Sequence, residues 1–183
     1  ATCGQAPYKA VLTHGFLVDE QGRKMSKSLG NGVDPMQVIR DMGADILRLW
    51  VSSADYRNDV AASPRIMKQM VEAYRKIRNT LRFMLGNLYD FDSAKHMVSY
   101  QNLQEIDRWL LGKLAEIIEK VIKANDDYEF HVAYHAIHNF CTVELSAIYL
   151  DIVKDRLYVE SKDSTARRAA QTVIYEALNA LVR

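Results

Sequence analysis

The sequence predicts a mainly α-helical protein, in which an antiparallel helical bundle follows a small α/β segment with a short β-hairpin and a cationic loop. Two observations predict this class. Apolar residues recur at helical spacing almost without interruption from residue 63 to the end. By contrast, five of the eight glycines and two of the three prolines lie within the first 35 residues. We therefore expect a first domain at residues 1–60 and a truncated helical domain at 61–183.

Composition narrows the class of protein. The 183 residues are 49% apolar and 26% charged, with a net charge of +1, as in ordinary globular chains. Any attraction to nucleic acid must therefore come from local clusters of charge. The two cysteines, Cys3 and Cys141, have no CxxC spacing, which argues against a disulfide framework or a zinc ribbon and favours the cytoplasm. No apolar run is long enough to predict a membrane span.

The first domain is predicted from its turn and capping residues. Residues 8–13 and 15–18 are short, aromatic and β-branched, and DEQG at 19–22 supplies turn residues, which together predict two short strands or one hairpin. The cationic loop (residues 23–32) follows. Asp34 and Pro35 then mark the start of a helix that Gly43 ends near Met42, and a second helix begins near Ala44.

The second domain is predicted from helical periodicity. Apolar residues from Met67 to Leu88 alternate spacings of three and four, which indicates one long helix from about residue 63. Polar residues and glycine at 85–102 interrupt the pattern. Further helices are expected at about 103–125, 130–159 and 164 to the end. Long helices with short joints are typical of an antiparallel bundle.

The cationic loop reads RKMSKSLGNG and has the composition of a site for a polyanion. Lysine is a compact charge on a flexible stem, serine hydroxyls add donors, and glycines allow close backbone approach. The spacing differs from the GxxxxGK[ST] pattern of a P-loop. A solvated basic turn is the alternative for a generic pair of lysines.

Residues Lys24 to Ser28, KMSKS, match the signature loop of the class I aminoacyl-tRNA synthetases at all five positions. The segments HGFLVDEQGRKMSKSLGNGVDP, GADILRLWVSSADYRNDV and YRKIRNTLRFMLGNLYDFD closely resemble the isoleucyl-tRNA synthetase family. Later, YHAIHNFCTVELSAIYLDIVKDRLY is similar to its anticodon-binding helices. The resemblance covers essentially the whole chain. A valyl-tRNA synthetase, which shares KMSKSLGN, is the nearest alternative.

The resemblance implies a reaction and a role for each loop residue. Isoleucine and ATP, as its magnesium complex, would give isoleucyl-adenylate and pyrophosphate, and the acyl group would pass to tRNA(Ile). Lys27 would contact the ATP phosphates directly and Lys24 would assist. Ser26 and Ser28 would donate hydrogen bonds, and Met25 would pack beneath the loop.

A second set of basic residues lies on the first long helix. Lys68, Arg75, Arg78 and Arg82 fall on one stripe at about 100° per residue, away from the apolar stripe. An ordinary solvated face would explain them as well. The resemblance favours contact with the tRNA backbone.

The chain also lacks parts that the resemblance would require for catalysis. No HIGH-type tetrapeptide, which supplies the other half of the family's ATP site, is present, and His14-Gly15-Phe16 is no substitute. Since the chain begins without Met, we expect a segment of a longer, monomeric enzyme that binds isoleucine through a part not included here. Alone it should be inactive, and a non-catalytic RNA-binding helical module is the second alternative.

Two further groups of residues indicate packing rather than chemistry. His131, His135 and His138 share a helix face, but no cysteine or glutamate completes a zinc motif, so we expect this chain to bind no metal. Asp41, Asp45, Asp55 and Asp59 are spaced as caps and surface ion pairs.

Overall fold

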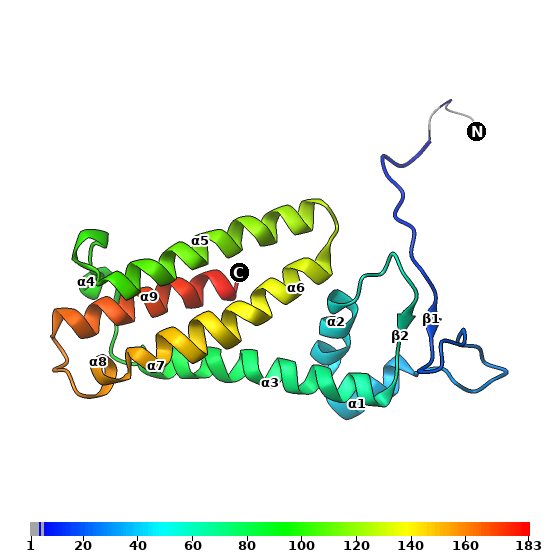
Figure 1. Ribbon diagram of the computed structural model, residues 1–183, viewed down its shortest axis with the longest axis horizontal. Helices are drawn as coiled ribbons and strands as arrows, with labels where there is room; N and C mark the ends of the chain where they lie inside the picture. The colour runs from blue at the N-terminus through cyan, green and yellow to red at the C-terminus, as the bar shows by residue number, and fades with distance from the viewer. Residues whose placement is uncertain (1–3, 5) are drawn as a thin grey trace. The chain divides into compact units, whose positions relative to one another are not determined.

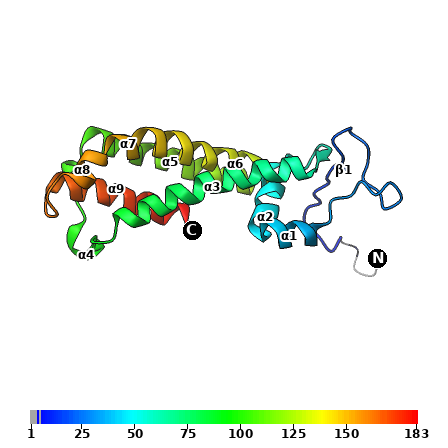
Figure 2. The same ribbon diagram turned by 90° about the horizontal axis from the view of Figure 1, so that it is seen from below.

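The computed structural model describes residue 4 and residues 6–183, which fall into two compact units. The loop unit extends to Gln69 and contains the cationic loop, and the helical unit begins at Met70. The division falls within one helix, α3 (Pro64–Asn87). Most of the described residues are helical (Figures 1 and 2).

The loop unit contains two strands that are distant in sequence. Strands β1 (Leu17–Val18) and β2 (Val60–Ala61) pair in parallel, with Leu17 opposite Val60 (Figure 1). Helices α1 (Pro35–Met42) and α2 (Ala44–Ser53) lie between them in sequence and pack on each other. Parallel strands require such a crossover connection.

The predicted β-hairpin is therefore wrong. Residues 8–13 form no strand, and β1 takes its partner from a segment more than forty residues later. Gly15 explains this pairing, because a Cβ atom there would lie 2.2 Å from the Asn58 carbonyl oxygen. Only glycine permits so close a backbone approach. The predicted turn at 19–22 is present, but it leads to a single antiparallel bridge between Val18 and Lys24.

Helices α1 and α2 begin and end as their sequence predicts. The Asp34 carboxylate accepts a hydrogen bond from the Met36 backbone nitrogen at 2.9 Å, and Pro35 occupies the first turn of α1. Gly43, with φ of 96°, ends α1 and donates to the Ile39 carbonyl. The two helices bury Val38, Ile46 and Trp50, which form much of the small apolar core of this unit.

The helical unit consists of α3 from residue 70 onward and of eight further helical elements. In chain order these are α4 (Ser93–His96), η1 (Tyr100–Asn102), α5 (Glu105–Asp126), α6 (Phe130–Asn139), η2 (Phe140–Tyr149), α7 (Leu150–Ile152), α8 (Lys154–Tyr158) and α9 (Thr165–Leu181). Helix α5 packs along both α6 and α9 (Figures 1 and 2). None of the described helices is long and apolar enough to cross a membrane.

The helix predicted at 130–159 is segmented. It widens into a π-helical stretch at η2, and Val153 interrupts it before α8. The Thr142 hydroxyl donates to the His138 carbonyl at 2.8 Å, at the start of η2. Such back-bonding competes with the backbone pattern of a regular α-helix.

The core of the helical unit combines apolar side chains with buried ion pairs. Met84, Leu110, Leu145, Tyr149 and Ile174 are among its fully buried members. The Asp107 carboxylate, also fully buried, accepts two hydrogen bonds from Arg156 at 2.9 and 2.8 Å and one from the Tyr149 hydroxyl at 2.7 Å. This network joins α5 to η2 and α8.

A second buried network attaches α9 to the segment that follows α3. Arg167 donates to both oxygens of Asp90, at 2.7 and 3.0 Å, and the Gln171 amide donates to Asp90 at 2.8 Å. Arg168 donates to the Asp90 carbonyl at 3.0 Å. These interactions hold the pKa of Asp90 well below its usual range, with the Arg167 hydrogen bond as the largest cause.

Candidate functional site

The cationic loop leaves β1 through a tight turn. Asp19 donates its backbone N–H to the Arg23 carbonyl at 2.9 Å, and Gly22, with φ of 75°, donates to the Asp19 carbonyl at 3.0 Å. The Met25 backbone nitrogen then donates to the Leu17 carbonyl at 3.0 Å. The first part of the loop is thus attached to the strand by backbone hydrogen bonds.

The residues predicted to bind ATP form one short segment with two environments. Met25 and Ser26 are half-buried, whereas Lys24, Lys27 and Ser28 are exposed. The Lys24 ammonium lies 3.7 Å from the centroid of the Phe16 ring, which is a cation–π contact. Within the described residues, the Lys27 ammonium has no hydrogen bond or ion pair to a protein group. An exposed ammonium of this kind can approach an anionic ligand without first breaking an ion pair.

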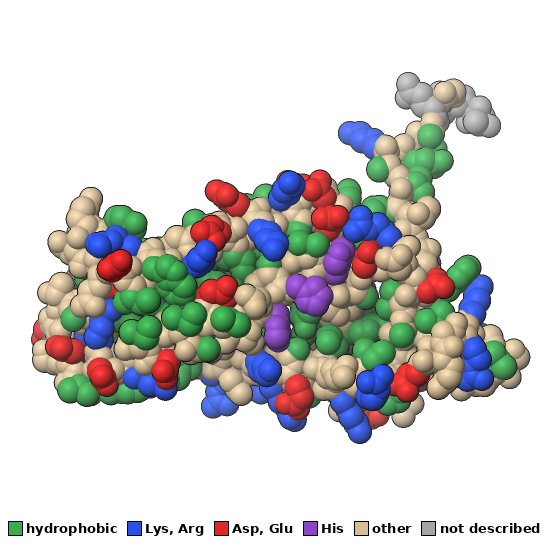
Figure 3. Space-filling view, in the orientation of Figure 1, with side chains coloured by type: hydrophobic (Ala, Val, Ile, Leu, Met, Phe, Trp, Pro, Cys, Tyr) green, Lys and Arg blue, Asp and Glu red, His purple; other side chains and the backbone are tan. Residues whose placement is uncertain are grey.

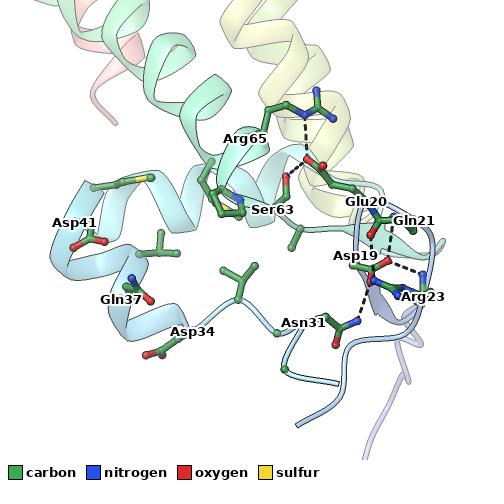
Figure 4. A pocket seen from close by; sticks show the side chains of 18 residues that line it. Asp19, Glu20, Gln21, Arg23, Asn31, Asp34, Gln37, Asp41, Ser63 and Arg65 are labelled. Carbon is green, nitrogen blue, oxygen red and sulfur yellow. Dashed lines mark hydrogen bonds and ion pairs between the residues drawn. The ribbon is translucent and has the colours of Figure 1, made fainter. Parts of the chain in front are cut away.

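The turn before the loop is also attached to the start of α3. The Glu20 carboxylate accepts hydrogen bonds from the Ser63 hydroxyl at 2.7 Å and from Arg65 Nε at 3.0 Å (Figure 4). Ser63 is the largest cause of a lowered pKa at Glu20. An open cavity of about 590 Å³ lies beside these residues and is lined also by Asp34 and Asp41.

Sequence reasoning placed Asp19 only in a turn and gave no role to Asn31, yet these two side chains hold the loop. Asn31 donates to the Asp19 carboxylate at 3.0 Å across twelve residues. This hydrogen bond is the largest cause of a pKa of about 2 at Asp19; burial opposes it, and hydrogen bonds from Arg23 and Gln21 lower the pKa further. Asp19 is therefore ionised at neutral pH. The available signals were an aspartate at the end of a strand and an asparagine between two glycines.

The four residues predicted to bind tRNA all lie on α3. Lys68, Arg75, Arg78 and Arg82 are exposed, and Lys and Arg side chains gather along this helix in Figure 3. Arg75 forms an ion pair with Glu72 at 2.7 Å, with both side chains exposed. A surface pair of this kind contributes little to stability, so it leaves Arg75 available to another anion.

The three histidines lie on α6, where Figure 3 shows histidine side chains gathered. The Tyr134 ring lies 5.0 Å from the ring of His135 and 5.9 Å from that of His138, centroid to centroid. Burial is the largest cause of a lowered pKa at His138. Within the described part of the chain, no three His, Cys, Asp or Glu residues are placed to hold a metal ion.

Two family models match the chain. Residues 1–63 match the class I tRNA synthetases of the isoleucine, leucine, methionine and valine group, and residues 107–183 match the anticodon-binding domain of tRNA ligases. The first match covers the cationic loop, and the second covers the chain from α5 to α9. The fold and the loop thus define a segment of a class I aminoacyl-tRNA synthetase.

Relatives of known name narrow this class. The chain is 73% identical over its full length to an isoleucine–tRNA ligase of Desulfitobacterium hafniense (strain DSM 10664 / DCB-2) and 69% identical to that of Carboxydothermus hydrogenoformans. The chain belongs to the isoleucine–tRNA ligase family. It spans 20% of the length of these relatives.

Two solved structures share the fold at lower identity. One is the agnB2 LeuRS of Agrobacterium radiobacter K84, in a ternary complex with tRNA and LeuAMS, at a TM-score of 0.65 and 21% identity. The other is the methionyl-tRNA synthetase of Mycobacterium tuberculosis with methionyl-adenylate, at 0.66 and 20%. Each match covers 92% of this chain, and 20% and 33% of those chains respectively.

Proposed function

We propose that the chain supplies the ATP-phosphate loop and the tRNA-binding helices of an isoleucine–tRNA ligase. The whole enzyme would activate isoleucine with ATP, as its magnesium complex, and transfer the acyl group to tRNA(Ile) in the cytoplasm. The observation that carries this proposal is the full-length identity of 73% to a ligase of that name. The two relatives named above match this chain over its full length, and both are isoleucine–tRNA ligases. Isoleucine is therefore favoured over valine as the substrate.

The exposed lysines of the cationic loop fit the charge changes of adenylation. As the carboxylate of isoleucine attacks the α-phosphorus, negative charge builds on the α-phosphate and on the leaving pyrophosphate. Cations that reach these oxygens mainly in the transition state raise kcat without over-binding ATP. We assign direct contact to Lys27, support to Lys24, and hydrogen bonds to Ser26 and Ser28. Met25, which is half-buried, would pack beneath them.

We further propose that the helical part is the antiparallel bundle of a class Ia anticodon-binding domain, with its boundary near residue 61. Contact between α5 and both α6 and α9 supports this arrangement. The tRNA backbone would run along Lys68, Arg75, Arg78 and Arg82, whose exposure leaves their cations accessible. The ligase would act as a monomer.

The loop proposal is tested in a full-length isoleucine–tRNA ligase that carries these residues. We expect Lys27→Ala to lower kcat for isoleucine-dependent ATP–pyrophosphate exchange by about 100-fold or more, with a smaller change in KM for ATP. Lys24→Ala should have a milder effect of the same kind. Lys123→Ala, which removes an exposed lysine of α5, is the matched control. An unchanged kcat with a raised KM would limit Lys27 to ground-state binding.

The 183-residue chain by itself should catalyse no such exchange, since it lacks a HIGH-type sequence. Measurable exchange by the purified chain would show that the catalytic groups have been assigned to the wrong place. A chain that binds tRNA without exchange would act, in isolation, as an RNA-binding helical module.

The tRNA proposal is tested by the dependence of affinity on salt. Replacing Arg75, Arg78 and Arg82 together with glutamine should weaken binding of cognate and non-cognate tRNA alike, because backbone contacts carry little sequence information. The log–log slope of affinity against salt should fall by about two to three units, because fewer counterions are released. Replacing Lys113, Lys120 and Lys123 of α5 matches the change in charge. If the salt dependence of tRNA affinity has the same slope in wild type and in the α3 variant, the basic residues of α3 face solvent and do not contact tRNA.

A further inference from the structure

Asp19 is the point at which several groups of the cationic loop converge. Its side chain accepts hydrogen bonds from the backbone nitrogens of Gln21 and Arg23, at 3.0 and 2.9 Å, and from Arg23 Nε at 2.8 Å. The fourth donor is Asn31 Nδ2 at 3.0 Å (Figure 4). Asp19 is only 8% exposed, so its carboxylate relies on these donors in place of water.

Asn31 connects this carboxylate to the middle of the loop. Its Oδ1 atom accepts a hydrogen bond from the Ser26 backbone nitrogen at 3.0 Å, and its Nδ2 atom lies 3.5 Å from the Lys24 carbonyl. The two ends of the loop are therefore joined to each other and to the backbone on both sides of Met25. Lys24 and Lys27 flank this fixed segment.

The tip of the loop is bonded mainly to itself. The Ser26 and Ser28 hydroxyls lie 3.1 Å apart, the Leu29 backbone nitrogen donates to the Ser26 hydroxyl at 3.3 Å, and Gly30 donates to the Lys27 carbonyl at 3.3 Å. Gly30 has φ of 61°, a conformation that glycine adopts without strain. Ser26 is thus the residue through which Asn31 reaches the tip.

We propose that Asp19 and Asn31 form a latch, the Asp19–Asn31 hydrogen bond, that positions Lys24 and Lys27 for adenylation. Neither residue contacts ATP in this proposal; both act by fixing the backbone from which the lysines extend. The inference rests on the proposed function of the loop. A turn alone would need only the hydrogen bonds that Asp19 accepts from the backbone nitrogens of Gln21 and Arg23. The hydrogen bond to Asn31, twelve residues away, is what ties the far end of the loop.

The chemistry of the pair allows a reciprocal test. In Asp19→Asn two amide nitrogens, both donors, face each other unless one side-chain amide flips. In Asn31→Asp two carboxylates, both acceptors, face each other. The double variant Asp19→Asn/Asn31→Asp restores a donor facing an acceptor, since the new asparagine donates to the new aspartate. Its Oδ1 atom can still accept from Gln21 and Arg23, and the new carboxylate can accept from Ser26. Neither the bond from Arg23 Nε nor the contact of the residue 31 amide nitrogen with the Lys24 carbonyl is restored.

The first measurement follows the loop in the 183-residue chain. Amide hydrogen exchange at Ser26 and trypsin cleavage after Lys24 and Lys27 should both be faster in each single variant and return toward wild type in the double variant. If one of the single variants fails to fold, Asn31→Ala tests the latch instead, because it leaves Asp19 its three other donors. Trp50 fluorescence measures whether each variant is folded. Asp41→Asn, the same change of charge beside the same cavity, should have no effect.

The second measurement uses full-length ligase. Each single variant should lower kcat for pyrophosphate exchange by about 10- to 100-fold, as expected for misplaced catalytic groups, and the double variant should recover most of it. If the rate of amide hydrogen exchange at Ser26 is unchanged in the Asn31 variants, the latch is overturned, whatever the kinetics of pyrophosphate exchange. If the amide hydrogen exchange instead changes as expected while Lys27→Ala leaves kcat of the ligase unchanged, that result would support the latch and refute the proposed function of the loop. If amide hydrogen exchange at Ser26 is faster in the single variants but their kcat is unchanged, the latch does not position Lys24 and Lys27 for adenylation.

Discussion

The loop unit and the helical unit are each stabilised internally by a different kind of interaction. In the loop unit, single polar side chains bind backbone groups, as Asp19 binds Gln21 and Arg23 and Asp59 binds Phe16. In the helical unit, a large apolar core is accompanied by two carboxylates paired with arginine, the fully buried Asp107 and the half-buried Asp90. The loop unit fixes the path of its chain locally, whereas the helical unit fixes whole helices against each other.

This difference suits the two proposed tasks. A loop that is proposed to reach phosphates mainly in the transition state is held by local interactions, and each hydrogen bond to a charged carboxylate contributes only about 1.5–3 kcal/mol. A surface that presents charges along a helix needs that helix to stay in place. Buried pairs with arginine help to do this because their geometry is specific.

The largest expected effect concerns the buried ion pair of the helical unit. Asp107→Asn leaves the Arg156 guanidinium, whose side chain is 12% exposed, without its carboxylate. We expect the free energy of unfolding to fall by about 3–5 kcal/mol. Urea unfolding followed by Trp109 fluorescence in a Trp50→Phe background would measure it. Trp50, in a Trp109→Phe background, would report on the loop unit.

The matched control is the exposed pair between Lys113 and Glu116, at 2.8 Å on α5. Glu116→Gln should cost less than about 1 kcal/mol, because water screens the pair. Adding Arg156→Met to Asp107→Asn should recover part of the loss, since no unpaired charge is then buried. Equal losses for Asp107→Asn and Glu116→Gln would contradict the difference between buried and exposed pairs.

The next effect should appear in the loop unit. In Gly15→Ala the added Cβ atom would meet the backbone of Asn58 and push β1 away from the segment before β2. We expect a loss of about 1–3 kcal/mol, reported by Trp50. Gly32→Ala, where nothing lies within 4 Å of the added atom, is the control. If both variants behave as wild type, the parallel pairing of β1 and β2 has another cause than Gly15.

Acid should weaken the helical unit through Asp90. Its pKa is lowered in the fold from an ordinary value of 3.8, so its contribution is complete above that value and is lost as the pH falls below it. The groups that face it are Arg167, Arg168 and the Gln171 amide. The free energy of unfolding should fall progressively as the pH is lowered from about 4 toward the lowered pKa of Asp90, and the fall should be shallower in Asp90→Asn. Parallel curves for the two proteins would assign acid sensitivity to other carboxylates.

The sequence predicts the elements that depend on nearby residues. The caps at Asp34 and Gly43, the long helices α3 and α5 and the exposure of Arg75 and Arg78 follow from local spacing, and the structure confirms them. The KMSKS motif also indicates the class I aminoacyl-tRNA synthetases through its five consecutive residues. Local patterns suffice for such features because each partner lies within a few positions.

Features with distant partners could not be predicted in this way. The partner of β1 is set by a backbone contact between Gly15 and Asn58, and the hairpin prediction took the nearest candidate instead. Arg167 and Arg168 are buried only because Asp90 is brought beside them, whereas a charged pair in a helix ordinarily suggests exposure. The link between Asp19 and Asn31 was not predicted for the same reason, since their hydrogen bond spans twelve residues.

The smallest effect is a gain in stability in the helical unit. Gly112 lies inside α5, is exposed, and has nothing within 4 Å of an added Cβ atom. Gly112→Ala should therefore raise the free energy of unfolding by about 0.5–1 kcal/mol, because alanine loses less backbone entropy in a helix. Thermal unfolding followed by Trp109 should show a higher midpoint, with Trp50 unchanged. The same substitution thus harms the loop unit at Gly15 and helps the helical unit at Gly112. A loss of stability in Gly112→Ala would show that this face of α5 is closely packed after all.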